Sequence, residues 1–134
     1  MRNNRRSQVG ILIAGDLAVI LVVTLFGFAS HGTLGTAGAR MLSTFFPLLA
    51  GWFAVAPFLL VYNPKMAAAP VQLWRPFWAM VIAAPLAAFL RGVWLNTAIL
   101  PVFVFVLGGI SSLAILIWRG IYLAALNLRR RSNG

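Results

Sequence analysis

The stretch VGILIAGDLAVILVVTLFGFAS, residues 9–30, decides the fold class of this chain, because Asp16 is its only charged residue. A helix that crosses a membrane needs about 20 mostly apolar residues to match a hydrocarbon core of about 30 Å. Residues 9–30 meet that length, whereas the apolar region of a secretory signal has only about 7–15 residues. We therefore predict a retained first membrane helix over residues 9–30.

Three further apolar runs follow, over residues 41–62, 76–95 and 98–118. In lipid, backbone polar groups have to be bonded internally, by a helix or by a closed barrel. The alternating pattern of a barrel strand is missing from these runs. The sequence therefore predicts an all-α membrane protein, with four transmembrane helices in a small bundle. We expect one domain over residues 1–134, with a basic C-terminal tail over residues 119–134.

The composition agrees with a membrane protein. Hydrophobic residues make up 62% of the chain and charged residues 9%, whereas soluble domains have roughly half apolar and about a quarter charged residues. In a soluble protein, the net charge of +10 would favour nucleic acid as a partner. Here the basic residues flank apolar runs, where anionic lipid headgroups would meet them. We therefore expect anionic lipid as a partner and no nucleic acid.

The basic side chains also predict the orientation. One side of the predicted membrane collects Arg2, Arg5, Arg6, Lys65, Arg75, Arg119, Arg129, Arg130 and Arg131. The other side has only Arg40 and Arg91. Because Lys and Arg are enriched on the cytoplasmic side of membrane proteins, we expect both termini in the cytoplasm. The predicted location is the cell (plasma) membrane, with anionic lipid at its cytoplasmic face.

Asp16 is the only acidic residue of the chain. A charge near the bilayer centre costs about 2.5–3.5 kcal/mol on insertion scales, so Asp16 should face protein. Ser112 and Arg119 share one face of the fourth helix at helical spacing. Gly108 and Ser112 form a pair of small residues that lets another helix approach. We expect the first and fourth helices to touch, with Ser112 donating to Asp16 and Arg119 reaching toward it.

Two interpretations of Asp16 are open at this point. In the first, Asp16 is a buried polar contact that fixes the register of the helices. In the second, it binds a proton or an ion, which is a common role of ionisable residues inside membranes. A proton relay needs successive titratable groups, so the sequence favours the first interpretation.

A second polar site is predicted toward the outer face. Arg91 interrupts the predicted third span and His31 closes the first span at a similar height, and together they could frame a site for an anion or a lipid headgroup. The alternative is that Arg91 only extends to the interface, as long basic side chains near helix ends commonly do. His31 would then be an ordinary interfacial residue, and Trp118 would belong to an aromatic belt at the inner interface.

The inventory of side chains argues against an enzyme. The chain has one His, one acidic residue and no Cys, so paired carboxylates, metal clusters and a cysteine dyad cannot be assembled in it. Asp16 and His31 would lie about 22 Å apart along one helix, which is too far for a Ser-His-Asp set. We therefore expect no catalytic residues, no metal and no cofactor.

An ordered set of short motifs resembles one known family. The motifs are GD at residues 15–16, SHG at 30–32, FFPLLAGW at 45–52, APLAAFLRG at 84–92, FVFV at 103–106 and IWRG at 117–120. In order and spacing they resemble the bacterial and archaeal membrane family called domain of unknown function 3054, over about residues 15–120. The resemblance implies a four-helix integral membrane protein, and it implies no activity.

Two functions fit these predictions. The first is a small multi-pass accessory or structural membrane component that acts through helix and lipid contacts. It would work within a homo-oligomer or a larger membrane complex. The alternative is a small oligomeric transporter or channel that uses Asp16 as an intramembrane carboxylate for an ion or a proton.

Overall fold

The computed structural model describes residues 2–134, with the side chains of Arg2, Asn3 and Leu34 left out of the description. The predicted place of the Arg2 side chain, on the basic side of the membrane, therefore lies outside the part of the chain that the structure describes. The elements in chain order are α1 (Arg2–Ser30), η1 (Leu34–Thr36), α2 (Gly38–Val55), α3 (Pro64–Ala67), η2 (Pro70–Gln72), α4 (Trp74–Leu95) and α5 (Pro101–Ser132).

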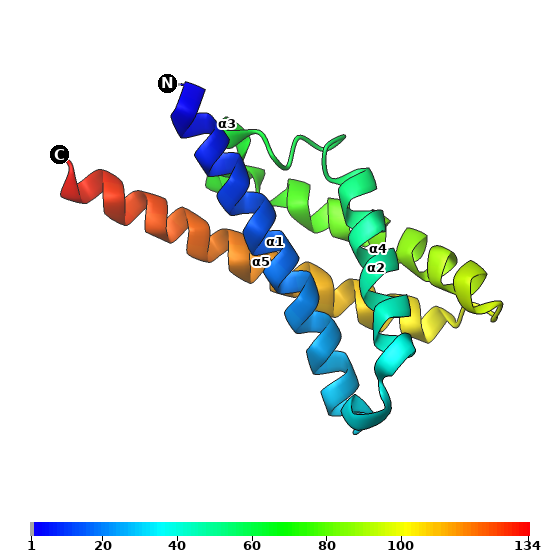
Figure 1. Ribbon diagram of the computed structural model, residues 1–134. Coiled ribbons are helices and arrows are strands. Elements are labelled where there is room, and N and C mark those ends of the chain that lie inside the picture. Colours follow the sequence, from blue (N-terminus) through cyan, green and yellow to red (C-terminus); the bar gives the residue numbers. More distant parts are fainter. Residues whose placement is uncertain (1) are drawn as a thin grey trace.

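The predicted all-α class is confirmed for this part of the chain. Within residues 2–134, every regular element is helical, and four helices are long and apolar enough to cross a membrane. In Figure 1, α1 and α5 cross each other, and the N-terminal and C-terminal ends lie at the same end of the molecule.

The predicted second span, residues 41–62, is wrong at its C-terminal end. The helix stops at Val55, because Pro57 has no N–H to donate to the preceding turn. The chain then turns, and Leu60 adopts a positive φ of 57°. The turn matters for the site, since it brings Tyr62 within hydrogen-bond distance of Trp52 on α2.

The first and fourth helices are longer than predicted. α1 begins at Arg2 instead of residue 9, and α5 runs from Pro101 to Ser132 instead of from 98 to 118. The predicted tail over residues 119–134 is therefore mostly helix. Hydropathy marks where the lipid core ends, whereas a helix continues through Ala, Leu and Arg, which are good helix formers. The basic residues of the last turn also interact favourably with the helix dipole.

The core lies mainly between α2 and α4. Leu48 and Trp52 of α2 and Met80 of α4 are fully buried there. The two helices approach closely at Gly51, where an added Cβ would lie 2.8 Å from the backbone carbonyl oxygen of Ala83. Small residues allow such approaches between membrane helices. The predicted small-residue position Gly108 instead faces α4, because its Cβ would lie 3.2 Å from that of Ala84.

The substitution Gly51→Ala is expected to lower the free energy of unfolding by about 1–3 kcal/mol, because the added methyl group would force α2 and α4 apart. Thermal unfolding of the purified protein in micelles measures the change. Gly109→Ala is the matched control, since an added Cβ at this α5 position meets nothing within 4 Å. If both variants unfolded at the same temperature as the unchanged protein, the close contact at Gly51 would be refuted.

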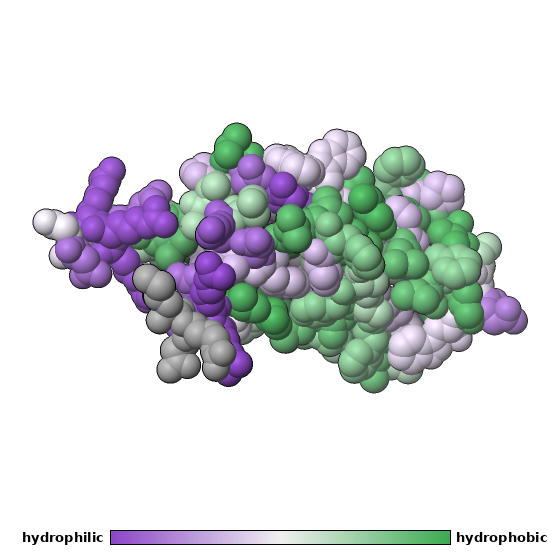
Figure 2. All heavy atoms as spheres, turned by 90° about the horizontal axis from the view of Figure 1, so that it is seen from above, coloured by the Kyte–Doolittle hydropathy of each residue, from purple (hydrophilic) through white to green (hydrophobic). Residues whose placement is uncertain are grey.

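The outer surface of the bundle is largely apolar. Large apolar side chains of α1 and α5, such as Phe26, Phe105 and Ile117, are exposed. On the face seen in Figure 2, apolar surface predominates away from one end of the molecule, where most of the hydrophilic surface gathers. An apolar surface of this extent is typical of helices that face lipid or other helices.

Candidate functional site

The carboxylate of Asp16 lies at the centre of a hydrogen-bonded cluster. Asp16 is 0% exposed. Its Oδ2 accepts hydrogen bonds from Arg119 Nη2 at 2.8 Å, from Tyr62 OH at 2.8 Å and from Trp52 Nε1 at 3.2 Å. Its Oδ1 accepts one from Trp118 Nε1 at 3.1 Å. We call these five residues the Asp16 cluster.

The cluster joins segments that are far apart in the sequence. Asp16 comes from α1, Trp52 from α2, Tyr62 from the turn after α2, and Trp118 and Arg119 from α5. Trp52 Nε1 also donates to Tyr62 OH at 2.8 Å, so the donors are bonded to one another as well. The Asp16 cluster therefore ties α1, α2 and α5 together in one register.

A glycine makes room for one of the donors. An added Cβ at Gly15 would overlap the indole ring of Trp118. The absence of a side chain at Gly15 lets this ring lie against α1, with its N–H toward the neighbouring carboxylate. This packing accounts for the GD pair at residues 15–16.

The chemistry of the cluster suits an ionised carboxylate. All four partners of Asp16 donate, and a carboxylate accepts hydrogen bonds at both oxygens. Arg119 supplies the opposite charge as an ion pair and is itself only 3% exposed. A buried ion pair is tolerated where further hydrogen bonds satisfy its remaining atoms, and the phenol and the two indoles supply them here.

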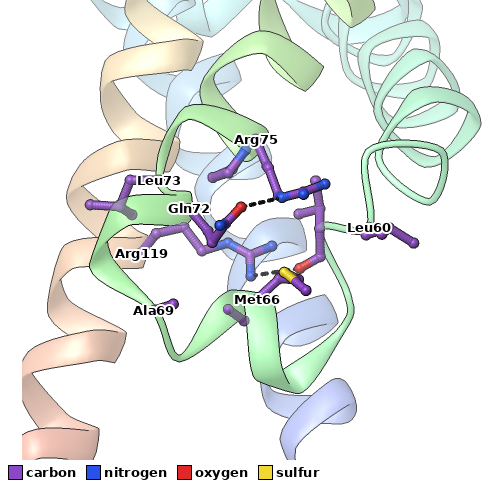
Figure 3. Close-up of a pocket in the computed structure, with 10 residues that line it drawn as sticks. Leu60, Met66, Ala69, Gln72, Leu73, Arg75 and Arg119 are labelled. Atoms are coloured by element: carbon purple, nitrogen blue, oxygen red, sulfur yellow. Dashed lines mark hydrogen bonds between the residues drawn. The ribbon is translucent and has the colours of Figure 1, made fainter.

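Arg119 is covered on its other side by the connection between α2 and α4, residues 56–73. Its Nη1 donates to the carbonyl of Val61 at 3.4 Å. Arg75 in turn donates from Nη1 to the carbonyl of Leu59 at 3.0 Å. Figure 3 shows Arg119 within a hollow formed by this connection. The hollow has a volume of about 10 Å³, which is room for about one water molecule.

The structure brings Asp16 and Arg119 together, and α1 and α5 touch as expected. The predicted hydrogen bond from Ser112 to Asp16 is not formed. The buried Ser112 Oγ has no hydrogen-bond partner among the described residues. The prediction placed Arg119 beyond the end of the fourth span, on the basic side of the membrane, and expected Ser112 to donate to Asp16. Since α5 continues to Ser132, Arg119 itself lies level with Asp16, about 10 Å along the helix from Ser112.

Three members of the cluster were not predicted as site residues: Trp52, Tyr62 and Trp118. Trp118 was assigned to an aromatic belt, but its indole N–H points to Asp16. A buried indole or phenol usually needs an acceptor, and the chain has one carboxylate side chain to offer. The sequence could therefore have predicted aromatic donors to Asp16. It did not indicate which of the tryptophans and tyrosines are buried.

Arg91 and His31 line the same cavity. This cavity has a volume of about 520 Å³ and lies between the C-terminal part of α1 and the N-terminal part of α5. Arg91 Nε donates to Thr44 Oγ1 of α2 at 3.2 Å, and its guanidinium lies 5.0 Å from the ring centre of Phe103 of α5. Arg91 is therefore held among the helices, while His31 is exposed at the rim.

Side chains that commonly bind metal ions are not grouped in the part of the chain that the structure describes. Across residues 2–134, no group of three or more His, Cys, Asp and Glu side chains lies together in a way that could hold an ion.

A comparison with protein families gives one match. The family described as "Protein of unknown function (DUF3054)" matches residues 13–122, a range that contains the whole Asp16 cluster. No curated protein and no solved structure matches the chain. Because the match covers most of the 134 residues, this chain belongs to the DUF3054 family.

Proposed function

We propose that this protein is a structural or accessory component of the cell membrane, which acts through its helix surfaces and its contacts with lipid. The observation that carries the proposal is the enclosure of Asp16. Its carboxylate is 0% exposed and is held by Arg119, Tyr62, Trp52 and Trp118. A carboxylate bound in this way fixes helix packing.

Transport through Asp16 is less well supported. A transported ion would have to displace Arg119, which is also bonded to Val61. A proton relay needs further titratable groups, and the titratable side chains that contact Asp16 are Arg119 and Tyr62 alone among the described residues. Both donate to Asp16, so neither provides an acceptor for a departing proton.

The exposed apolar surfaces of α1 and α5 also support the proposal. α1 and α5 expose a series of large apolar side chains along most of their length, including Leu21, Val22 and Phe26 on α1 and Phe105 and Ile117 on α5. Surfaces of this kind can pack against lipid, a second copy or another membrane protein. We therefore place the activity of the protein on these surfaces, within a homo-oligomer or a larger membrane complex.

Native mass spectrometry after gentle extraction from membranes tests the proposal. We expect a second protein at fixed stoichiometry, or a homo-oligomer, with no small ligand that depends on Asp16. Reconstituted vesicles test the alternative directly. A proton or sodium flux that Asp16→Asn abolished, while the variant stayed folded, would overturn the structural role and favour a transporter.

The outer cavity extends the proposed contacts with lipid. Arg91 has no acidic partner, because the only acidic side chain of the chain is paired with Arg119. An anion or a lipid headgroup at the outer face would compensate this charge. Arg91→Gln in the purified protein is expected to reduce the anionic lipid that remains bound from the outer leaflet, and unchanged retention would contradict this role.

Both termini are proposed to lie in the cytoplasm, because Lys and Arg gather at their end of the bundle. The chain has no cysteine, so single cysteines can report the orientation. In intact cells, a membrane-impermeant maleimide is expected to label Thr36→Cys in the opposite connection. It should label Ser132→Cys only after the membrane is permeabilised. The reverse pattern would contradict the orientation.

A further inference from the structure

A second polar cavity lies at the end of the molecule that carries both termini, outside the Asp16 cluster. It is formed between α1, α3 and α5 and has a volume of about 540 Å³. Four cationic side chains line it: Arg5, Lys65, Arg129 and Arg130. We call it the basic cavity. In Figure 2, most of the hydrophilic surface gathers at one end of the molecule.

No acidic side chain neutralises these four charges. Asp16 is the only acidic residue, and it is paired with Arg119 inside the bundle. Like charges gathered around one cavity repel each other and raise the local concentration of anions. The charge of the basic cavity therefore favours an anionic ligand over a neutral one.

At the basic cavity, Tyr122 places a hydroxyl that has no hydrogen-bond partner among the described residues. Its side chain lines the basic cavity and is 6% exposed. Its hydroxyl is buried and has no hydrogen-bond partner in the part of the chain that the structure describes. A buried hydroxyl without a hydrogen-bond partner is unfavourable, and a ligand oxygen that entered beside the ring would satisfy it. The Tyr122 ring is also held, since it packs 6.2 Å from that of Trp118.

An adjoining hollow provides room for an apolar chain. It has a volume of about 200 Å³ and shares Tyr122 and Arg129 with the basic cavity. Its apolar side is formed by Ile11, Trp118 and Ile121, and its polar side by Asn4, Ser7 and Gln8. A ligand with phosphates in the basic cavity could therefore place a hydrocarbon chain along α1 and α5.

We propose that the basic cavity binds the headgroup of a phospholipid with two phosphates, of the cardiolipin class. Arg5, Lys65 and Arg129 surround the phosphates, and the Tyr122 hydroxyl donates to a phosphate oxygen. Basic pockets between membrane helices on the cytoplasmic side bind such headgroups. The inference rests on the proposed function, because it requires this end of the bundle to face the cytoplasmic leaflet.

Native mass spectrometry of the purified full chain tests this site by titration with tetraoleoyl cardiolipin or with dioleoyl phosphatidylglycerol. We expect one cardiolipin to bind at least tenfold more tightly than phosphatidylglycerol, which has a single phosphate. The double substitution Arg5→Gln with Arg129→Gln should weaken cardiolipin binding about 30-fold, since each basic residue near a charged lipid surface contributes about fivefold.

The matched control is Arg6→Gln with Arg131→Gln. It removes the same charge from the same end of the molecule, but neither residue lines the basic cavity. This control should change the affinity less than about threefold. Equal losses in both double variants would overturn the proposal, because they would show general attraction to a basic surface.

Two further measurements separate the ligand classes. Tyr122→Phe should weaken cardiolipin binding several-fold while leaving the unfolding temperature unchanged or higher, because the hydroxyl has no partner in the free protein. Pyrophosphate should not displace the lipid at equal concentration. If it did, the site would bind a soluble phosphate and the lipid proposal would be wrong. This result would leave the role of the Asp16 cluster untouched, since that role is measured by helix packing and flux.

Discussion

Asp16→Ala is expected to lower the free energy of unfolding by about 3–5 kcal/mol, one of the two largest effects of any single substitution in this protein. Removing one partner of a buried ion pair leaves the other charge buried without compensation. Arg119 is 3% exposed. Without Asp16, its remaining hydrogen-bond acceptor in the structure is the carbonyl oxygen of Val61. Unfolding in mixed micelles, titrated with a denaturing detergent, measures the loss.

Ser112→Ala is the matched control for this substitution. Ser112 is also buried and polar, but its Oγ has no partner among the described residues. Its removal should change the free energy of unfolding by less than about 0.5 kcal/mol. A large loss at Ser112 with a small loss at Asp16 would restore the bond expected from the sequence and refute the cluster.

The double substitution Asp16→Ala with Arg119→Ala separates the pair from its surroundings. We expect it to destabilise the protein by less than the sum of the two single changes, with a coupling energy of about 1–3 kcal/mol. Additive losses would show that the two side chains do not interact. Asp16→Asn adds a test of charge, because it keeps the shape of the side chain and one acceptor oxygen for Trp118.

The sequence predicts the number of membrane helices and the meeting of Asp16 with Arg119. Both follow from the free-energy cost of placing a charged side chain, or backbone polar groups without hydrogen bonds, in lipid. The helix ends follow less well, because hydropathy marks where the lipid core ends and not where the helix itself stops, which for α5 is Ser132. Pro57 ended α2 early for a local reason, and only the turn that follows places Tyr62 beside Asp16.

The aromatic donors could not be predicted for a different reason. A tryptophan near the end of an apolar run is typical of a membrane interface, and the sequence pattern of Trp118 is the same whether it faces headgroups or a buried carboxylate. The distinction depends on the crossing of α1 and α5 (Figure 1) and on the space left by Gly15. These are properties of helix packing, which single-helix periodicity does not contain.

The other of the two largest effects is expected at Trp52. Trp52→Ala should lower the free energy of unfolding by about 3–5 kcal/mol, because a fully buried tryptophan leaves a large cavity when it is truncated. Trp52 is 0% exposed and packs in the core with α4. It also donates to both Tyr62 and Asp16, so its loss affects the core and the cluster at once.

One further variant separates the packing contribution of Trp52 from its hydrogen bonds, and a second variant serves as the control. Trp52→Phe keeps most of the volume and removes the indole N–H, so it should cost about 1–2 kcal/mol. Trp94→Ala is the matched control, because Trp94 of α4 is 57% exposed and the same truncation there leaves no buried cavity. If Trp52→Phe were as damaging as Trp52→Ala, the hydrogen bonds of the Asp16 cluster would outweigh the packing of α2 on α4. If Trp94→Ala matched Trp52→Ala, the assignment of Trp52 to the core would be wrong.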